Sequence, residues 1–542
     1  MAKSDLSIDI LGTAITISTD EDPEYLKKLL EKYKQTIDNV QRISGLKDPL
    51  KLAILTGFLL SDDLEKAGLS FQERGSGTET PHPEESGEAE MITLGMLSRL
   101  DEALEVSSGA ETTGEIITPA VRGAIFKLQN TVKNYDWGSP EWIPALVGQK
   151  NLSRVPWAEL WMGVNPLAPS RVVLQEENES GEAGYGEAPL LSALIDQEKE
   201  AFLGPDAGRI YGTLPFLFKV LAAAKPLSIQ VHPNREQAEE GFDRENQAGI
   251  PLNAPNRNYR NPNHKPEIIC AIEPFAALCG FRKAAEIAFL TEIISQGSEG
   301  ALKAGFETLI SALKEENKNP HEAFLSGLFS LGTEARQALG PFIKAQVPLL
   351  ESDFPEYLDE WKLCSYLAGL YPGDIGIIAP LYLNIIELEP GEAMYLPAGV
   401  FHSYIHGMGM ELMADSDNVL RGGLTPKYTD PAELLNIINF SEYTPEILRV
   451  PSPAPSWFSY PTPAEEFTLS VMHGQGNSIS YPETGPSIVF ITEGSAVVTE
   501  PEAVPGNGAE MVLSKGESVF IPAGENRRLV FSGAFTAYAA AY

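Results

Sequence analysis

The chain has 542 residues, which exceeds what one hydrophobic core usually serves, so three or more domains are expected. Its hydrophobic content of 43% and charged content of 21% are those of an ordinary globular protein. The net charge of −35 argues against binding to nucleic acid or to an anionic membrane, because both require basic surfaces. An anionic substrate would therefore need a local cluster of cations.

The cysteines indicate a reducing compartment. Cys270, Cys279 and Cys364 form no C-x-x-C pair, so neither disulfides nor thiolate zinc sites are expected. The N-terminus shows no apolar signal segment, and the longest apolar run, residues 52–60, is too short to cross a bilayer. We predict a cytoplasmic protein without a membrane span.

The first part of the chain predicts a small α+β domain over residues 1–70. Residues 6–19 have the pattern of a β-hairpin. Leucines at three- and four-residue spacing predict an amphipathic helix to about residue 40, and a second helix is predicted for residues 49–66. The acidic segment 71–120, rich in Gly, Ser and Pro at its start, is predicted to be a flexible linker with one short helix.

Three motifs in this domain resemble the head of ZapA, a cell-division protein that associates with FtsZ. They are Ile8-Asp-Ile-Leu-Gly-Thr, Asp22-Pro-Glu-Tyr-Leu and Asp48-Pro-Leu-Lys-Leu-Ala-Ile-Leu. The resemblance covers about the first 70 residues and implies self-association through the head. Here residues 68–88 interrupt the coiled coil that follows the head in that family. Two hypotheses stay open, a homo-oligomer formed by residues 1–70 and a contact with FtsZ.

The remainder of the chain is predicted to be mainly β. Residues 121–280 and 373–450 form the two parts of a β core, and residues 281–372 have the 3.6-residue period of a helical insert. An internal repeat matches Gly391-Glu-Ala-Met-Tyr-Leu-Pro-Ala-Gly399 with Gly516-Glu-Ser-Val-Phe-Ile-Pro-Ala-Gly524.

The two copies of the repeat differ three residues after the last glycine. His402 follows the first copy and Arg527 follows the second. We therefore predict that residues 451–542 form a lobe of the same type without metal. The predicted fold is two cupin (jelly-roll) units with an α-helical insert and a small α+β N-terminal domain.

A strand of alternating character lies at residues 227–233. Alternation sends Ser228, Gln230 and His232 to one face. Glu267 and His402 can complete a Gln/His/Glu/His set, which suits a divalent ion such as zinc in a Lewis-acid role.

Four of the seven histidines fall in the predicted β core: His232, His264, His402 and His406. By alternation, His406 shares the strand face of His402 and is a competing ligand. For any one of them, a hydrogen-bonded core residue is the alternative. Trp137 likewise could stack on a sugar ring or be a half-buried core residue.

Six motifs, in the same order, resemble type I mannose-6-phosphate isomerases, and the resemblance covers about residues 122–542. The motifs are Tyr135-Asp-Trp-Gly, Ala158-Glu-Leu-Trp-Met-Gly, Leu227-Ser-Ile-Gln-Val-His-Pro, Asn263-His-Lys-Pro-Glu267, Tyr395-Leu-Pro-Ala-Gly-Val-Phe-His402 and Asp415-Ser-Asp-Asn-Val-Leu-Arg421-Gly-Gly-Leu-Thr-Pro-Lys427. The resemblance implies a zinc-dependent aldose–ketose isomerase that interconverts mannose 6-phosphate and fructose 6-phosphate through a cis-enediol(ate), in GDP-mannose synthesis or mannose catabolism. One Zn²⁺ per catalytic unit would be held by Gln230, His232, Glu267 and His402.

One departure from that family is Asn165, which stands where the family usually has histidine. It lies outside the ligand set, so we expect altered local packing and retained activity.

The resemblance places Arg421 in the active site, where its fixed charge suits an enediolate or a phosphate. The acid/base stays open among five residues: Lys265, Asp417, His264, Glu411 and Tyr404. The predicted substrate-binding residues are Lys219, Lys265, Arg421 and Lys427 as cations, Ser228 as a hydrogen-bond donor and Trp137 as a stacking surface.

A second hypothesis is a cupin that binds sugar phosphate without turnover and is tethered to an FtsZ-associated assembly by its head. The intact set of motifs argues against it. The sequence does not choose between the two directions of flux, or identify the metal bound in the cell.

Overall fold

The computed structural model describes most of the chain after residue 124. Described are residues 125–173, 176–177, 183–184, 188–500, 510–524 and 528–542, and near the N-terminus residues 4–10, 13–19, 36–37 and 56. The chain divides into two compact units, residues 1–114 and residues 115–542.

In the first unit, strands β1 (Ser4–Ile10) and β2 (Thr13–Thr19) form an antiparallel hairpin in which Ile8 pairs with Ile15. The predicted hairpin is confirmed. Residues 36–37 and 56 are helical. The remainder of the two predicted helices, and the predicted linker with its short helix, lie outside the described residues.

The larger unit contains two sheets that share one long strand, β15. The first has the order β17-β14-β11-β15-β9-β5-β4, and the second contains β13, β12, β10 and β16, also joined through β15. The bounds are Ile447–Leu448 (β17), Ala393–Leu396 (β14), Glu267–Ala271 (β11), His402–Ala414 (β15), Phe216–Ala223 (β9), Glu159–Met162 (β5), Thr131–Lys133 (β4), Leu383–Leu388 (β13), Phe275–Phe281 (β12), Ile229–Val231 (β10) and Leu420–Gly423 (β16).

Strand β15 changes partners along its length. Its first residues pair with β12 and β10, and residues 407–414 pair with β9, with β11 alongside. Apolar side chains from both sheets, such as Leu221 and Ile269 from one and Ala277 and Cys279 from the other, form one buried cluster. The two sheets therefore face each other across a common interior.

A third sheet has the order β18-β19-β23-β20-β22-β3-β6, with β21 on β20. Its strands are Trp457–Ser459 (β18), Thr468–Ser480 (β19), Val530–Ala541 (β23), Ser487–Thr499 (β20), Ser518–Ile521 (β22), Phe126–Gln129 (β3), Arg171–Val172 (β6) and Met511–Ser514 (β21). Because Phe126 pairs with Phe520, a strand from the start of this unit completes a sheet built mainly by its end. Phe218 and Ile268 of the first sheet share a core with Phe490 and Phe520 of the third.

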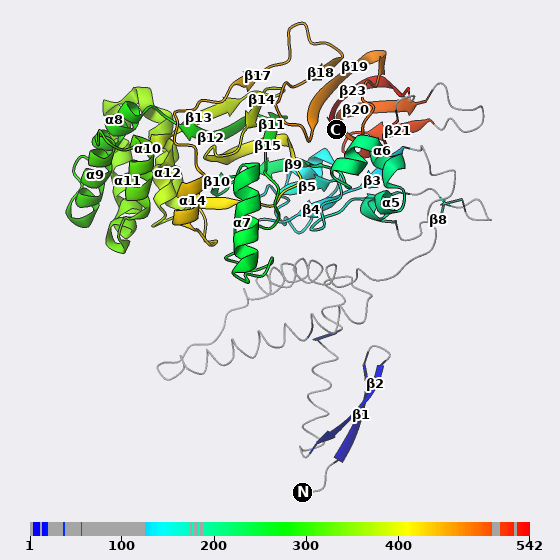
Figure 1. The fold of residues 1–542 in the computed structure, drawn as a ribbon, viewed down its shortest axis with the longest axis horizontal. Coiled ribbons are helices and arrows are strands. Elements are labelled where there is room, and N and C mark those ends of the chain that lie inside the picture. The colour runs from blue at the N-terminus through cyan, green and yellow to red at the C-terminus, as the bar shows by residue number, and fades with distance from the viewer. Residues whose placement is uncertain are drawn as a thin grey trace. The chain divides into compact units, whose positions relative to one another are not determined.

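Helices cover the outer face of the β13/β12/β10 sheet. Ile229, Val231 and Leu278 point into a core that they share with the helical region, which lies at the left in Figure 1. The helices there are α8 (Ala284–Ile294), α9 (Gly300–Ala312), α10 (Pro320–Phe329), α11 (Thr333–Asp353), η1 (Pro355–Tyr357), α12 (Leu358–Leu370), η2 (Ile375–Ile378) and α13 (Ala379–Tyr382).

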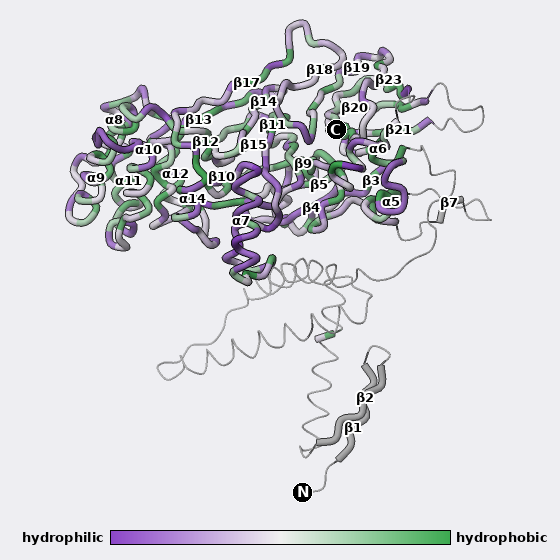
Figure 2. Tube along the Cα trace, viewed as in Figure 1, coloured by the Kyte–Doolittle hydropathy of each residue, from purple (hydrophilic) through white to green (hydrophobic). Residues whose placement is uncertain are grey.

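The remaining elements lie around the sheets. They are α4 (Trp142–Leu146), α5 (Leu191–Gln197), α6 (Lys199–Ile210), α7 (Arg235–Gln247), α14 (Pro431–Ile437), β7 (Glu176–Glu177) and β8 (Ala183–Gly184). Hydrophilic colour runs along most of α7 in Figure 2, as expected for an exposed helix. No helix in the described ranges is both long and apolar enough to span a bilayer.

The two copies of the sequence repeat form equivalent local structures. Gly391 and Gly516 have φ values of 87° and 84°, a left-handed conformation that glycine adopts without a steric penalty. Each glycine is followed two residues later by a short strand, β14 or β22. Arg527 lies outside the described residues. The predicted β-rich fold with helices is confirmed at this level.

Candidate metal centre and surrounding pocket

Three polar residues form a row across the β10/β15/β16 part of the second sheet. Gln230 pairs with His402 on one side and with Arg421 on the other. Residues that pair across neighbouring strands point to the same face. The predicted alternation at residues 227–233 therefore brings Gln230 next to a histidine that lies far away in the sequence.

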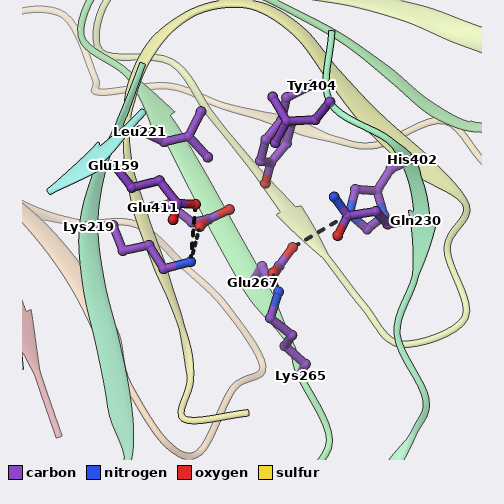
Figure 3. A pocket seen from close by; sticks show the side chains of 10 residues that line it. Glu159, Lys219, Leu221, Gln230, Lys265, Glu267, His402, Tyr404 and Glu411 are labelled. Atoms are coloured by element: carbon purple, nitrogen blue, oxygen red, sulfur yellow. Dashed lines mark hydrogen bonds and ion pairs between the residues drawn. The ribbon is translucent and has the colours of Figure 1, made fainter. Parts of the chain in front are cut away.

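A carboxylate from the opposite sheet meets this row. Glu267 is the first residue of β11. Its Oε2 atom lies 3.5 Å from Nε2 of His232 and 3.6 Å from Nε2 of His402. The ligand-type atoms of these three buried residues all lie within 4.8 Å of one another. The structure therefore brings together the predicted cluster, with the Gln230 amide beside His402 (Figure 3).

Hydrogen bonds fix the orientation of both imidazoles. His232 Nδ1 lies 2.8 Å from the backbone carbonyl of Asn418, and His402 Nδ1 lies 2.9 Å from that of Val400. A carbonyl only accepts, so each Nδ1 carries a proton, and each ring turns its Nε2 atom toward Glu267. Burial, reinforced by the charge of Lys265, lowers the pKa of His232 to about 4, so its ring is neutral at pH 7.

The Nε2 atom of His232 is buried and has no hydrogen-bond partner among the described residues. Unpaired buried polar atoms are rare and need an explanation such as a missing ion. Burial raises the pKa of Glu267, but Lys265 and the two histidines outweigh it and hold the pKa well below its usual range. A charged carboxylate beside two imidazoles is a donor set that fits zinc.

Charged residues line the wall of the pocket away from the histidines. Lys219 Nζ lies 2.9 Å from Glu411 Oε2 and 3.7 Å from Glu159 Oε1. Lys219 faces Glu411 directly across β9 and β15. The two carboxylates outweigh burial and raise the pKa of Lys219, which keeps it charged. Figure 3 shows these three side chains together at one side of the pocket.

Tyr404 and Lys265 complete the lining. Lys265 forms an ion pair with Glu267. The Tyr404 hydroxyl points into the pocket in Figure 3. Burial and the neighbouring carboxylates of Glu411 and Glu267 raise its pKa well above the ordinary value, so the hydroxyl keeps its proton. The pocket thus holds both charged and protonated groups beside the candidate metal centre.

A cluster of cations involves Arg421. Burial and the charge of Arg260 lower the pKa of Arg421, and burial, Arg421 and Arg260 lower that of Lys427. Each of these cations thus disfavours the charged form of its neighbours, and we call Arg421, Arg260 and Lys427 the cluster of cations. Arg421 pairs with Gln230 across β16 and β10, which places the cluster beside the row of polar residues. Lys427 Nζ lies 5.7 Å from the centroid of the Tyr135 ring. Arg260 was not among the site residues predicted from the sequence.

Two predicted substrate residues, Trp137 and Ser228, are not among the residues that line the pocket. Trp137 stacks on Tyr135 with ring centroids 5.6 Å apart, and is half-buried against the interior of the two sheets. Ser228, just before β10, is half-buried.

Two of the acid/base candidates lie outside the pocket lining. His264 Nε2 lies 2.6 Å from Glu466 Oε1, which also accepts from Arg235 Nη2 at 2.7 Å. Asp417 is half-buried. The other three candidates, Lys265, Glu411 and Tyr404, all line the pocket. The lining also includes Glu159, which the sequence reasoning missed although its motif was recognised.

The prediction that His406 shares the face of His402 is wrong. Tyr404 pairs with Ala277 and His406 with Ala276, so Ile405 is an extra residue in a β-bulge. The bulge reverses the alternation, and His406 is exposed with its ring against Trp142, at 5.1 Å between centroids. Strict alternation could not reveal the inserted residue.

Asn165, the departure from the family noted in the sequence, forms a hydrogen bond with Asp415. Its Nδ2 atom donates to Asp415 Oδ1 at 2.9 Å. Burial, with a contribution from Asp417, raises the pKa of Asp415 to about 6 although this hydrogen bond lowers it.

The fold and the site together define a β-sandwich protein with a histidine–carboxylate centre of the metal-binding type in a charged pocket. Residues 125–284 match the family model of the phosphomannose isomerase type I catalytic domain. The chain is 38% identical to mannose-6-phosphate isomerase of Salmonella typhimurium over 401 residues, covering 74% of this chain and 95% of the relative. It is 37% identical to that of Escherichia coli over 402 residues, with the same coverage. The chain belongs to the mannose-6-phosphate isomerase family.

Solved structures agree with this assignment. A crystal structure of zinc-bound mannose 6-phosphate isomerase matches with a TM-score of 0.67 and 35% identity, covering 77% of this chain and 99% of that one. A phosphomannose isomerase mutant from Salmonella typhimurium matches with the same TM-score and coverage and 34% identity. Residues 6–105 match the family model of the cell division protein ZapA, so that match extends into the predicted linker.

Proposed function

We propose that this protein is a zinc-dependent mannose-6-phosphate isomerase that interconverts mannose 6-phosphate and fructose 6-phosphate through a cis-enediol(ate). The observation that carries the proposal is the unpaired, buried Nε2 of His232, which faces Glu267 and His402 beside a pocket of charged groups. Gln230, His232, Glu267 and His402 would hold one zinc ion. When bound, zinc supplies Lewis-acid stabilisation of negative charge on the sugar oxygens.

The chain's own residues would move the proton. Isomerisation takes a proton from C2 and returns one to C1, so one group must reach both carbons. Lys265, Glu411 and Tyr404 line the pocket and are the candidates that we favour over His264 and Asp417. Because Tyr404 stays protonated, it suits hydrogen-bond donation to a sugar oxygen as charge develops there.

The phosphate would bind at the cluster of cations. Arg421 and Lys427 are favoured, with Ser228 as a donor and Trp137 backing the Tyr135 ring. Lys219 already forms ion pairs with Glu159 and Glu411. We therefore assign it the role of positioning Glu411 and not that of binding the phosphate.

The domain organisation follows the same proposal. Residues 121–280 and 373–450 would form the catalytic cupin unit, with residues 281–372 as its insert, and residues 451–542 a metal-free cupin-like lobe. Equivalent glycine turns before β14 and β22 support two related units. Strand β3 would then belong to the catalytic cupin unit by sequence but pair with β22 in the sheet of the C-terminal lobe.

A coupled assay for fructose 6-phosphate tests the activity. The full-length protein is expected to turn over mannose 6-phosphate, to lose this activity with a chelator and to regain it with zinc. The alternative, a tethered cupin that binds sugar phosphate without turnover, is not favoured, because the pocket is lined by candidate proton-transfer groups and the relatives are named mannose-6-phosphate isomerase. Saturable binding with no product in the presence of zinc would establish that alternative.

For the head, we propose self-association through residues 1–70, with the β1–β2 hairpin as part of it. Sedimentation of the protein with and without residues 1–110 tests this. An unchanged number of subunits after removal would disprove it. Pull-down with purified FtsZ tests the second hypothesis for the head.

The three cysteines are free thiols, in line with a cytoplasmic location.

A further inference from the structure

The Asn418 side chain is a buried junction between the candidate metal centre and a neighbouring loop. It is 0% exposed. Its Oδ1 atom accepts from the backbone N–H of Arg260 at 2.7 Å and of Asn261 at 3.3 Å. Its Nδ2 atom donates to the carbonyls of Asn261 at 2.7 Å and Asn263 at 2.9 Å. Both ends of the amide are therefore saturated by one loop.

The backbone of the same residue holds a predicted metal ligand. The Asn418 carbonyl accepts from His232 Nδ1 at 2.8 Å, and it is this bond that points Nε2 toward Glu267. One buried residue thus orients an imidazole with its main chain and holds a loop with its side chain.

The loop held by Asn418 runs from the cluster of cations to the pocket lining. Arg260, at its start, acts electrostatically on Arg421 and Lys427, and Arg421 pairs with Gln230 of the lining across β16 and β10. Lys265 and Glu267 follow a few residues later in the chain and line the pocket.

We propose that Asn418 is a positioning residue that keeps the metal centre and the cluster of cations in register, so that one substrate can meet both. This inference rests on the proposed isomerase function, because a sugar phosphate carries its carbonyl and its phosphate at opposite ends. A fixed separation between the two parts of the site is what selects a substrate of that length.

Only an amide satisfies this junction. Aspartate has the same shape but lacks the two N–H donors, so the carbonyls of Asn261 and Asn263 would face a negative charge. Alanine removes both ends of the junction without changing the charge. A buried N–H or carbonyl group left without a hydrogen-bond partner costs on the order of 1–3 kcal/mol. The loop is therefore expected to move until these backbone groups reach water.

The experiment compares Asn418→Asp and Asn418→Ala with a matched control, Asn151→Asp. Asn151 Nδ2 also donates to two backbone carbonyls, those of Pro140 at 2.9 Å and Val155 at 2.7 Å, but in a loop that does not line the pocket. The readouts are zinc affinity by chelator competition, kcat and KM for mannose 6-phosphate, inhibition by inorganic phosphate, and the thermal midpoint.

Both Asn418 variants are expected to lose about 10–100-fold in zinc affinity and in kcat, the range typical of groups that orient metal ligands. Inhibition by phosphate should weaken in both. Because alanine adds no charge, an effect shared by both variants cannot come from repulsion of the phosphate by a new carboxylate. Asn151→Asp should lower only the thermal midpoint.

The inference is overturned if zinc affinity, kcat and phosphate inhibition stay within about 3-fold of native, which is less than about 1 kcal/mol, while the thermal midpoint falls as in the control. That result would mean that Asn418 has a purely structural role. If both variants fail to fold, Ser416→Ala serves instead, because the single Ser416 O–H donor lies 3.0 Å from both Asn261 Oδ1 and the Asn263 carbonyl of the same loop. It should give the same pattern at smaller size, and a native profile would overturn the inference. Failure of the isomerase proposal is recognised separately, as absent turnover in the zinc-loaded native protein.

Discussion

Lys219 and Glu411 offer a test of how the pocket wall is held together. The side chains are 6% and 4% exposed, and a second carboxylate, that of Glu159, lies 3.7 Å from the ammonium. The perturbation is a double-mutant cycle of Lys219→Met, Glu411→Leu and both together. These substitutions roughly keep side-chain volume while removing charge.

The structure predicts unequal effects. Lys219→Met leaves Glu159 and Glu411 buried without their cation, and breaking a buried pair in this way costs about 3–5 kcal/mol. Glu411→Leu leaves Lys219 still paired with Glu159, so a smaller loss, about 1–3 kcal/mol, is expected. In the double variant only Glu159 remains, and it still accepts a hydrogen bond from Trp161 Nε1 at 2.7 Å. The stability loss of the double variant should fall short of the sum of the two single losses by more than the loss of Glu411→Leu alone, that is by more than about 1–3 kcal/mol.

Urea unfolding measures the four stabilities, and the isomerase assay is run on the same samples. We expect the double variant to regain stability relative to Lys219→Met but no activity, because Glu411 is a favoured proton-transfer residue. Stabilities that add within about 0.5 kcal/mol would refute the reasoning, since independent sites behave in that way. Full activity of Glu411→Leu would remove it from the candidates.

Three further predictions concern the histidines, the metal and pH. His402→Ala should lose bound zinc and activity, measured by metal analysis and the coupled assay, whereas His406→Ala should keep both because the bulge turns it away. Dialysis against a chelator should lower the thermal midpoint of native protein by the linkage of binding to folding, and zinc should restore it. The pKa of Asp415 is raised from 3.8 to about 6, so the folded state favours the protonated form and stability falls as pH rises between these values. Asp415→Asn should therefore stabilise the protein at pH 8 by up to about 2–3 kcal/mol, but not at pH 3.5, and equal effects at both values would contradict this.

The predicted metal ligands came from two kinds of sequence signal, and the structure brings His232, Glu267 and His402 together. The alternation of Ser228, Gln230 and His232 needs only a strand, and the motifs supplied Glu267 and His402. The error at His406 has a local cause. One inserted residue, Ile405, reverses the face of every side chain after it, and nothing in the residue types reveals a bulge.

The pocket wall was harder to predict because it depends on strand pairing. Lys219 was expected to bind phosphate, yet it lies between Glu159 and Glu411, which come from β5 and β15. Which strands become neighbours, and in which register, is decided by the packing of whole sheets. Long-range contacts such as those of Asn418 and Glu466 likewise join segments whose proximity no periodicity encodes.

Strand β3 also constrains how the chain folds as it is synthesised. Phe126 and Leu128 leave the ribosome early, but their partners on β22, Phe520 and Ser518, are among the last residues translated. A strand with one apolar face that waits so long for its neighbour is slow to be placed and is exposed to aggregation meanwhile. A chain that stops before residue 451 would leave β3 with only the two-residue strand β6 as a neighbour. We expect such a truncated product to aggregate and not to fold into a smaller isomerase.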